Sequence, residues 1–326
     1  MRKKQRDTLA RSAMKLLCTL LGIILGLMIA VTCAFQYLLN QINTVSGAGT
    51  GALPVFSLSN VLEKKPDLSS LSLVPGESRV VNILLVGQDR REGETQARSD
   101  SMILCSLDRD AKRLTMTSFL RDLYVPIPGH GSNRINAAYS YGGINLLEQT
   151  IEDNFAVSVN GSIEVDFQQF SGIIDLLGGV PIDLRQDEAE IINQETGSSL
   201  TEGLQTLTGQ QALTYSRIRS LDLDGDFSRT NRQRKVLQAI MDICRNAGPA
   251  KLIPMMNQLL PMITTNLSSG QLLLLALEVV PQLSDFQLTS QRIPADGTFS
   301  DDTIDGMSVL VADLDAARQL LQNIAK

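Results

Sequence analysis

The stretch from residue 215 to residue 233 could hold an anion, because it gathers cationic side chains in a chain whose net charge is -6. Its arginines are Arg217, Arg219, Arg229 and Arg232. The first two are separated by one residue, so they point the same way only where the backbone is extended. Guanidinium forks favour phosphate or carboxylate groups, which they bind bidentately. The alternative is a solvated basic face with ordinary surface ion pairs.

A helix is expected to begin near Ser228 and to carry the second half of this stretch. Arg229, Arg232 and Gln233 are spaced i, i+3 and i+4, so they would share one face of that helix. Asp226 and Ser228 are both good N-cap residues. The positive end of the helix dipole would then lie beside the arginines. On this stretch alone both interpretations stay open.

Two aspartates mark the place where the first two predicted strands meet. Asp89 follows one apolar run, and Asp100 comes just before the next, with Arg98 beside it. If the two strands pair as a hairpin, the aspartates become neighbours at one edge of the sheet. Two close carboxylates need a proton or a bridging cation, and oxygen ligands suit Mg²⁺ or Mn²⁺. The alternative is that each aspartate forms a turn or a cap.

The third predicted strand leads directly into further charged residues. Arg121 and Asp122 follow it, and Arg134 and Asn136 come soon afterwards. Loops at the ends of strands are a common place for functional groups. Taken singly, each of these residues fits a surface ion pair or a helix cap equally well.

The composition describes a folded protein that can bury one large core or two modest ones. Of its 326 residues, 43% are hydrophobic and 20% are charged. The single histidine, His130, argues against a histidine-based triad or a multi-histidine zinc site. Cys105 and Cys244 lie far apart in the sequence, and a disulfide between them is left open.

The N-terminal part predicts membrane attachment. Residues 1–15 carry six Lys or Arg against one Asp, a charge of +5, and residues 16–39 contain no charged residue. This pattern predicts a transmembrane signal anchor with a cytoplasmic basic tail; a cleaved signal peptide is the alternative. Residues 40–78 predict an extracytoplasmic linker. Removing the +5 leaves -11 for the remainder, which argues against nucleic acid as a partner.

A single extracytoplasmic α/β domain is predicted for residues 79–326. Short apolar runs predict strands at 80–87, 101–107, 114–120, 180–184, 287–293 and 307–311. Helical patterns are found at 136–154, 167–177, 208–216, 229–245, 252–262, 271–280 and 312–324. Because strands and helices alternate, we expect a mixed central sheet covered by helices on both faces.

Six motifs occur in a recognisable order. They are Gly-x-Asp at 87–89, Arg-Ser-Asp-Ser-Met at 98–102, Arg-Asp-x-x-Val-x-Ile-Pro-Gly at 121–129, Arg-Ile-Asn-Ala-Ala-Tyr at 134–139, Tyr-Ser-Arg-Ile-Arg at 215–219 and Asp-Phe-Ser-Arg-Thr-Asn-Arg-Gln at 226–233. In this order the motifs closely resemble the LytR-CpsA-Psr family, over about residues 79–245. One departure is Leu120, where members of that family usually carry proline.

The resemblance implies a membrane-anchored extracytoplasmic phosphotransferase. Such enzymes move a glycopolymer, such as wall teichoic acid or capsule, from a polyprenyl-pyrophosphate carrier to a sugar hydroxyl of peptidoglycan. Two alternatives stay open. One is a hydrolase that acts on the same lipid carrier, and the other is a lipid-binding or regulatory membrane protein of the transcriptional attenuator type.

The resemblance also implies roles for individual residues. Asp89 and Asp100 would hold Mg²⁺, or Mn²⁺, against the pyrophosphate. The groups expected at the reacting phosphates are Arg98, Arg121, Arg217, Arg219 and Asp226. The groups expected to bind substrate around them are Asp122, Arg134, Asn136, Arg229, Arg232 and Gln233. Either Asp122 or Asp226 is a candidate to accept the hydroxyl proton.

Overall fold

The computed structural model describes residues 43–44, 80–89, 98–219, 221, 226–247, 255, 258–268, 271–272, 275, 279 and 284–325. The predicted basic tail, the predicted membrane anchor and most of the predicted linker lie outside these residues. Within the described part of the chain, no helix is both long and apolar enough to cross a bilayer. The predicted helices at 252–262 and 271–280 are described only in part: residues 255, 258, 259, 271, 272, 275 and 279 are helical, and Leu260–Met262 form a short 3₁₀ turn, η2.

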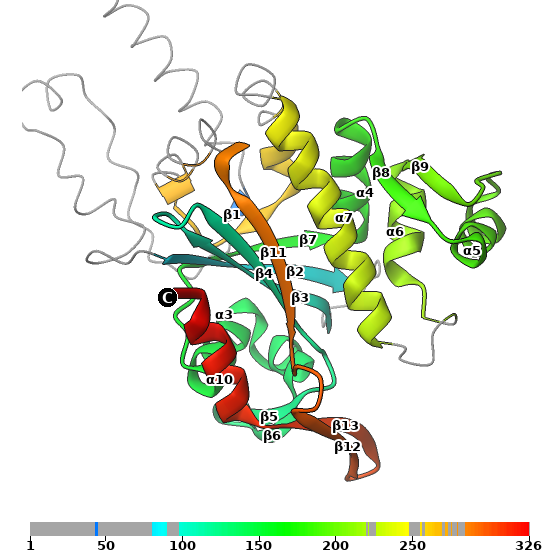
Figure 1. Ribbon diagram of the computed structural model, residues 1–326. Helices are drawn as coiled ribbons and strands as arrows, with labels where there is room; N and C mark the ends of the chain where they lie inside the picture. The colour runs from blue at the N-terminus through cyan, green and yellow to red at the C-terminus, as the bar shows by residue number, and fades with distance from the viewer. Residues whose placement is uncertain are drawn as a thin grey trace, which may run out of the picture. The chain divides into compact units, whose positions relative to one another are not determined.

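A seven-stranded mixed sheet forms the centre of the domain (Figure 1). Its strands, in spatial order, are β1 (Asn43–Thr44), β10 (Thr264–Thr265), β7 (Gly161–Asp166), β2 (Val80–Asp89), β3 (Arg98–Asp108), β4 (Arg113–Phe119) and β11 (Gln287–Ile293). The pairs β2–β3 and β3–β4 are antiparallel, whereas β2–β7 and β4–β11 are parallel. The expected mixed central sheet is confirmed. Its edge strand β1 comes from within the predicted linker.

Both faces of the sheet are buried, as the nearly all-apolar sequence of β2 predicts. Leu84 and Val86 pack into a core shared with α3 (Ile135–Phe155) and α10 (Leu314–Gln322). Val81 and Ile83 point the opposite way, into a second core that includes Phe286. Figure 1 shows α3 and α10 on one side of the sheet and α7 (Asp226–Ala247) on the other.

A third core lies beside α7 and belongs to the segment between β7 and α7. Its elements are α4 (Phe167–Leu176), β8 (Val180–Leu184), α5 (Gln186–Thr196), β9 (Gly203–Leu207) and α6 (Gly209–Arg217). The helices α4 and α6 meet through backbone at Gly209, where a Cβ atom would overlap the carbonyl oxygen of Ser171. The amide of Gly209 also donates to Oδ1 of Asp175 at 2.7 Å. The start of α6 is therefore fixed to α4.

Several local predictions are confirmed. Asp166 caps α4, and it forms a reciprocal capping box with Gln169. The long helix α3 is broken at Gly142 and Gly143, and Gly143 has the positive φ of 64° that favours glycine. The helix expected to begin near Ser228 is confirmed as α7, which begins two residues earlier, at Asp226. Ser228 therefore lies in its first turn.

Three short hairpins lie outside the central sheet. They are β5 (Tyr124–Ile127) with β6 (Gly131–Arg134), β8 with β9, and β12 (Phe299–Ile304) with β13 (Met307–Ala312). The predicted strands at 180–184 and 307–311 are confirmed as β8 and β13, whereas their partners and the β5–β6 hairpin were missed. The strands of these hairpins are four to six residues long and several are largely exposed, so hydrophobic alternation is weak. A short 3₁₀ turn, η4 (Asn323–Ala325), follows α10.

Candidate functional site

One edge of the sheet collects most of the predicted site residues. The strands β2, β4, β7 and β11 all end there, and β3 starts there, because β3 is antiparallel to both of its neighbours. The residues paired at this edge are Gln88 with Asp166, Asp89 with Arg98, and Phe119 with Ile293. Loops at this edge are therefore held by a rigid sheet, which is a frequent setting for functional groups.

The predicted pairing that brings the two aspartates together is confirmed for the backbone. Gly87 pairs with Ser101 and Gln88 with Ser99, so Asp100 is the extra residue of a β-bulge in β3. Asp89 is the last residue of β2. The side chains of Asp89, Arg98 and Asp100 lie outside the description. Among the side chains that are described, no group of three or more acidic, histidine or cysteine residues could hold a metal ion.

The backbone next to Asp89 is supported by a buried carboxylate. Oε2 of Glu164 accepts from Nε2 of Gln88 at 2.7 Å and from the hydroxyl of Tyr139 at 2.5 Å. Gln88 and Glu164 are both buried. A buried polar group of this kind fixes the conformation of its neighbours when its hydrogen bonds are made. Gln88 therefore gives the end of β2 a fixed orientation.

Arg121, Asp122 and Arg134 form one charged cluster just beyond β4. Nε of Arg121 lies 3.4 Å from Oδ2 of Asp122, and Nη1 of Arg134 lies 3.1 Å from Oδ1 of the same carboxylate. All three side chains stay partly exposed. The amide of Asn136, in the first turn of α3, donates to the carbonyl of Arg121 at 3.4 Å. The structure therefore brings these four sequence-predicted residues together.

Arg217 and Arg219 both reach the surface, on either side of a buried residue. The expected extended segment is shorter than predicted, because Arg217 is still the last residue of α6. Ile218 has extended backbone angles, φ -56° and ψ 127°, and its side chain is buried in the third core. The guanidinium of Arg217 lies 4.7 Å from the ring centre of Phe167, the first residue of α4. Because α4 follows β7 directly, Arg217 lies near the same edge of the sheet.

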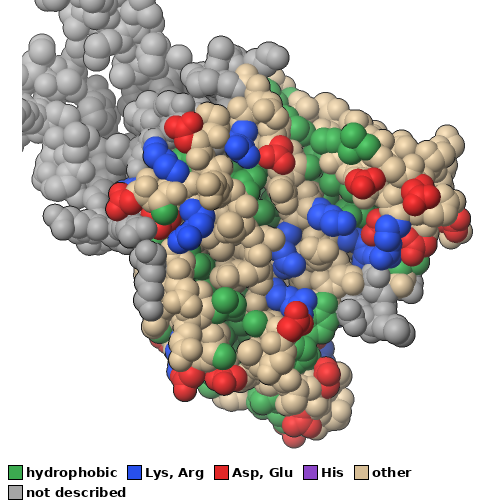
Figure 2. Space-filling model, viewed as in Figure 1, with side chains coloured by type: hydrophobic (Ala, Val, Ile, Leu, Met, Phe, Trp, Pro, Cys, Tyr) green, Lys and Arg blue, Asp and Glu red, His purple; other side chains and the backbone are tan. Residues whose placement is uncertain are grey.

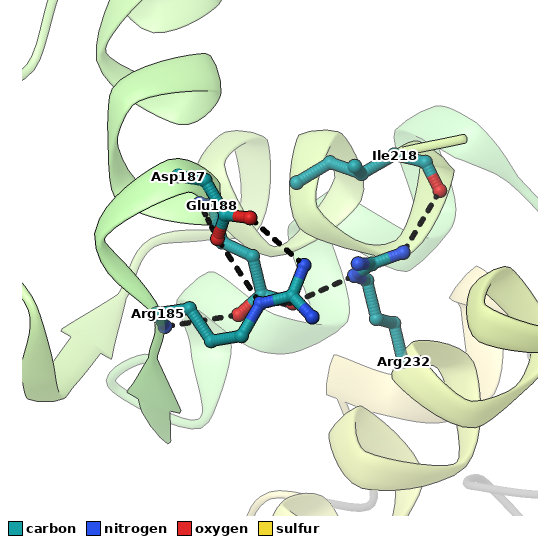
Figure 3. Close-up of polar contacts among 5 residues, drawn as sticks. All are labelled: Arg185, Asp187, Glu188, Ile218 and Arg232. Atoms are coloured by element: carbon teal, nitrogen blue, oxygen red, sulfur yellow. Dashed lines mark hydrogen bonds and ion pairs between the residues drawn. The ribbon is translucent and has the colours of Figure 1, made fainter. Parts of the chain in front are cut away.

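Arg232 points into the protein and holds the segment that carries Arg217 and Arg219. Figure 3 shows its guanidinium between α5 and the end of α6. Nε donates to Oε1 of Glu188 at 2.8 Å, and Nη1 donates to the carbonyl of Ile218 at 3.2 Å. Oε2 of Glu188 also accepts from the amide of Arg185. The structure therefore places Arg232 in an internal ion pair, apart from the two exposed arginines.

The remaining predicted residues lie on the first turns of α7. Arg229 is 2% exposed, and Gln233 is half-buried one turn later. Oε1 of Gln233 is buried and has no hydrogen-bond partner within the part of the chain that the structure describes. Asp226 is the first residue of the helix, and its side chain lies outside the description. Of these two residues on α7, Arg229 is therefore a buried group, whereas Gln233 stays partly exposed.

Sequence reasoning missed two residues beside this site, Arg234 and Arg292. Nη1 of Arg234 donates to Oγ of Ser118 at 3.0 Å, which joins α7 to the end of β4. Arg292 lies next to Ser118 in the parallel pairing of β4 with β11. Arg234 directly follows Gln233, a predicted site residue, and this position is a signal by which it could have been found. Nothing in the sequence around Arg292 indicates that it lies beside α7.

Basic side chains gather on the face of the domain that Figure 2 shows. Figure 2 shows Lys and Arg side chains gathered near the middle of that face, over the region where β11, α7 and α6 lie in Figure 1. Since the whole chain has a net charge of -6, this concentration is local. A face of this kind attracts anionic ligands.

Comparisons with known proteins agree on one family. The model of the LytR_cpsA_psr family matches residues 59–326. The polyisoprenyl-teichoic acid–peptidoglycan teichoic acid transferase TagU of Oceanobacillus iheyensis is 35% identical over 227 residues, which are 68% of this chain and 67% of that protein. The regulatory protein MsrR of Staphylococcus aureus is 38% identical over 162 residues, about half of each chain.

A solved structure with the same fold carries a lipid. It is the LytR-CPS2A-psr family protein YwtF (TagT) with bound octaprenyl pyrophosphate lipid, which is 29% identical to this chain. The match has a TM-score of 0.60 and covers 77% of this chain and 91% of that one. The family model covers more than half of the sequence, and the fold agrees. The chain belongs to the LytR-CpsA-Psr family.

Proposed function

We propose that this protein is a membrane-anchored phosphotransferase that moves a glycopolymer from a polyprenyl-pyrophosphate carrier to a sugar hydroxyl of peptidoglycan. The observation that carries the proposal is that arginines from two separate parts of the chain lie near one edge of the sheet. Arg121 comes from the end of β4, and Arg217 and Arg219 come from the end of α6. The names of the teichoic acid transferases TagU and TagT support the reaction class.

The chemistry of phosphoryl transfer suits this set of residues. The sugar hydroxyl attacks the phosphorus that carries the polymer, the bridging P–O bond breaks, and the polyprenyl phosphate leaves. Little covalent chemistry is required of the protein, so positioning and charge neutralisation dominate. Each charge-assisted hydrogen bond to a phosphate oxygen contributes roughly 1.5–3 kcal/mol. Arg217, Arg219, Arg121 and Arg98 are the residues that we assign to those oxygens.

Asp89 and Asp100 are the residues that would hold Mg²⁺ or Mn²⁺. The β-bulge puts both at the same corner of the sheet, and their carboxylate oxygens are ligands that such hard cations prefer. The ion would neutralise charge on the pyrophosphate. Activity that survives both chelation of divalent cations and the Asp89→Asn substitution would remove the metal from this proposal.

Of the two candidate proton acceptors, Asp226 fits better than Asp122. Both oxygens of Asp122 already face guanidinium groups, those of Arg121 and Arg134. A carboxylate with a guanidinium group on each oxygen is suited to positioning its arginines. We therefore assign Asp122 and Arg134 to the positioning of Arg121. Asp226, at the start of α7, is the residue to which we assign the proton.

The membrane attachment is part of the proposal. The basic residues 1–15 and the uncharged residues 16–39 support a single anchor with its N-terminus in the cytoplasm. The catalytic domain would then meet its lipid carrier at the outer surface of the membrane. Fusion of a topology reporter after residue 78 tests this point, and a cytoplasmic signal would contradict it.

An assay of the full chain in detergent tests the function. The mixture holds a lipid-linked pyrophosphate oligosaccharide, peptidoglycan fragments and Mg²⁺. Joining of the oligosaccharide to peptidoglycan supports the proposal, and loss of joining in the Arg219→Ala variant ties it to this site. Release of phosphate or free oligosaccharide alone would point to a hydrolase. Binding of the lipid without any turnover would point to a regulatory protein.

A further inference from the structure

A second pair of arginines lies beside the proposed site and has no assigned role. Arg234, on α7, donates from Nη1 to Oγ of Ser118, and Arg292 pairs with Ser118 across β4 and β11. The guanidinium of Arg292 lies 4.4 Å from the ring centre of Phe227 on α7. Both guanidinium groups therefore lie between α7 and the same point of the sheet. We call them the Arg234–Arg292 pair.

Arg234 is buried without a counter-ion. It is 9% exposed, its Nε is buried and makes no hydrogen bond to any described residue, and Nη1 donates to the neutral Ser118. No carboxylate of the described residues lies within ion-pair distance of it. Burial, and secondly the charge of Arg292, lower the pKa of Arg234. Buried arginines are normally paired, because an isolated charge away from water is costly.

Arg292 does not relieve this imbalance. It is engaged by the exposed Asp296 and by the carbonyl of Pro294. The charge of Arg292 is therefore partly neutralised by Asp296 at the surface. The charge of the buried Arg234 is not neutralised by any described carboxylate. Two neighbouring cations with free donor positions are the arrangement that binds an oxyanion bidentately. The hydroxyl of Ser118 supplies a further polar contact at the same point.

The location of the pair identifies the class of anion. Ser118 is the residue before Phe119 at the end of β4, the strand that leads into Arg121. Phe227 comes directly after Asp226 in the first turn of α7. The pair therefore adjoins the edge at which the pyrophosphate is expected to lie. An anion there is a phosphate group of the same substrate.

We propose that Arg234, Arg292 and Ser118 form an additional phosphate-binding subsite. It takes a phosphate group either of the prenyl pyrophosphate or of a phosphodiester in the transferred polymer. The inference rests on the proposed function for the identity of the substrate. The probes and variants of its test are therefore chosen so that the subsite and the proposed function can fail separately.

Binding is measured by calorimetry on the full chain in detergent, with two probes. Geranylgeranyl pyrophosphate carries a pyrophosphate without polymer, and a short glycerol phosphodiester oligomer carries phosphodiesters without pyrophosphate. We expect Arg234→Met to weaken binding of one probe by about tenfold to a hundredfold. The affected probe identifies which phosphate occupies the subsite. Arg234→Lys keeps the charge but loses the fork, so it should weaken the same probe by a smaller factor.

Lys235→Met is the matched control. Lys235 is the next residue on α7, it is exposed, and its substitution removes the same charge. It should change the affinity for either probe by less than about twofold, because an exposed charge is screened. Thermal unfolding without ligand checks that each variant is folded.

The outcomes separate the two proposals. If Arg219→Ala loses pyrophosphate binding while Arg234→Met binds both probes like the wild type, the subsite is overturned and the proposed function stands. If the wild type binds neither probe, both proposals fail. An equal loss in Arg234→Met and Lys235→Met would also overturn the subsite, because it would show a general effect of charge.

Discussion

Arg232 and Arg234 are two residues apart on α7, and both are buried, but their surroundings are opposite. Arg232 points towards α5 and is neutralised by Glu188 at 2.8 Å. Arg234 points towards β4, where it donates to the neutral hydroxyl of Ser118. A spacing of two residues turns side chains to well-separated faces of a helix. Arginine therefore forms an ion pair on one side of α7 and a hydrogen bond to a hydroxyl group on the other.

The difference separates structural from ligand-binding arginines. On the side of α5 and α6, the cation already has its carboxylate and its backbone acceptor, so nothing further is required. On the side of β4 and β11, Nε of Arg234 is buried and donates to no described residue. A buried ion pair adds little net stability, but removal of one partner is strongly destabilising. The predictions below are built on this asymmetry.

The largest effect is expected for Arg232→Met. The substitution leaves the carboxylate of Glu188 buried without its cation and removes the donor to the carbonyl of Ile218. We expect the free energy of unfolding to fall by about 3–5 kcal/mol. Urea denaturation followed by circular dichroism measures it. The double variant Arg232→Met, Glu188→Leu should recover most of the loss, and a failure to recover would show that the ion pair is not its source.

Arg219→Ala is expected to affect the reaction but not the fold. The side chain is exposed beyond the buried Ile218, so the free energy of unfolding should change by less than about 0.5 kcal/mol. The rate of transfer should fall about a hundredfold, which is typical for the loss of one transition-state donor. Arg185→Ala is a control, since Arg185 is a half-exposed arginine of the neighbouring helix start. An equal fall in rate in both variants would contradict a specific role.

Arg234→Met should change stability far less than Arg232→Met. It removes a buried cation that has no carboxylate partner among the described residues, and it removes one hydrogen bond to Ser118. These two effects oppose one another, so we expect a change within about 1 kcal/mol in either direction. The same urea experiment measures it. A loss as large as that of Arg232→Met would erase the distinction between the two sides of α7.

The smallest effect is expected at Glu148. Unlike Glu188, which is paired with Arg232, this carboxylate has no ion-pair partner among the described residues. Burial raises the pKa of Glu148, and the charges of Glu152 and Glu164 raise it further, against hydrogen bonds from Ser162 and Asn266. The folded protein therefore binds this proton more tightly than the unfolded chain, and the charged form costs stability. That cost is absent below the unfolded pKa and grows as the pH rises through the folded pKa.

Glu148→Gln should accordingly be slightly more stable than the wild type at pH 7. The difference should disappear as the pH falls below about 4, the usual pKa of an unfolded glutamate. Thermal unfolding of both proteins between pH 4 and pH 8 measures it. A difference that grew at low pH would have the wrong sign for this explanation.

Burial also affects the thiols of the two described cysteines. Cys105 and Cys244 are both free thiols, so the disulfide that the sequence left open is not formed. Burial raises the pKa of Cys105 to about 12 and raises that of Cys244 as well. Both are consequently protonated and unreactive at neutral pH.

Local sequence patterns predicted much of the frame. The apolar run of β2, the cap at Asp166 and the glycine break in α3 depend on neighbours in the sequence, and all three are confirmed. Ordered motifs also pointed to the charged cluster at Arg121 and Asp122. These signals are short-range or belong to a family pattern, so a single sequence carries them.

The partners of the arginines could not be predicted in the same way. Glu188 lies 44 residues before Arg232, and no periodicity links the two. Helical spacing placed Arg229 and Arg232 on one face, but it could not tell that Arg232 meets Glu188. The neighbourhood of Arg234 and Arg292 depends on the parallel pairing of β4 with β11, whose strands are separated by more than 160 residues. Long-range pairing of this kind has no local signature.

The close contact at Gly209 has a consequence for how a ligand is met. One end of α6 is fixed to α4 through backbone, and its other end is held by Arg232 at the carbonyl of Ile218. The segment with Arg217 and Arg219 therefore has little freedom to lose when an anion arrives. Such preorganisation reduces the entropic cost of association. A larger side chain at residue 209 would loosen Arg217 and Arg219 from a distance, without touching either.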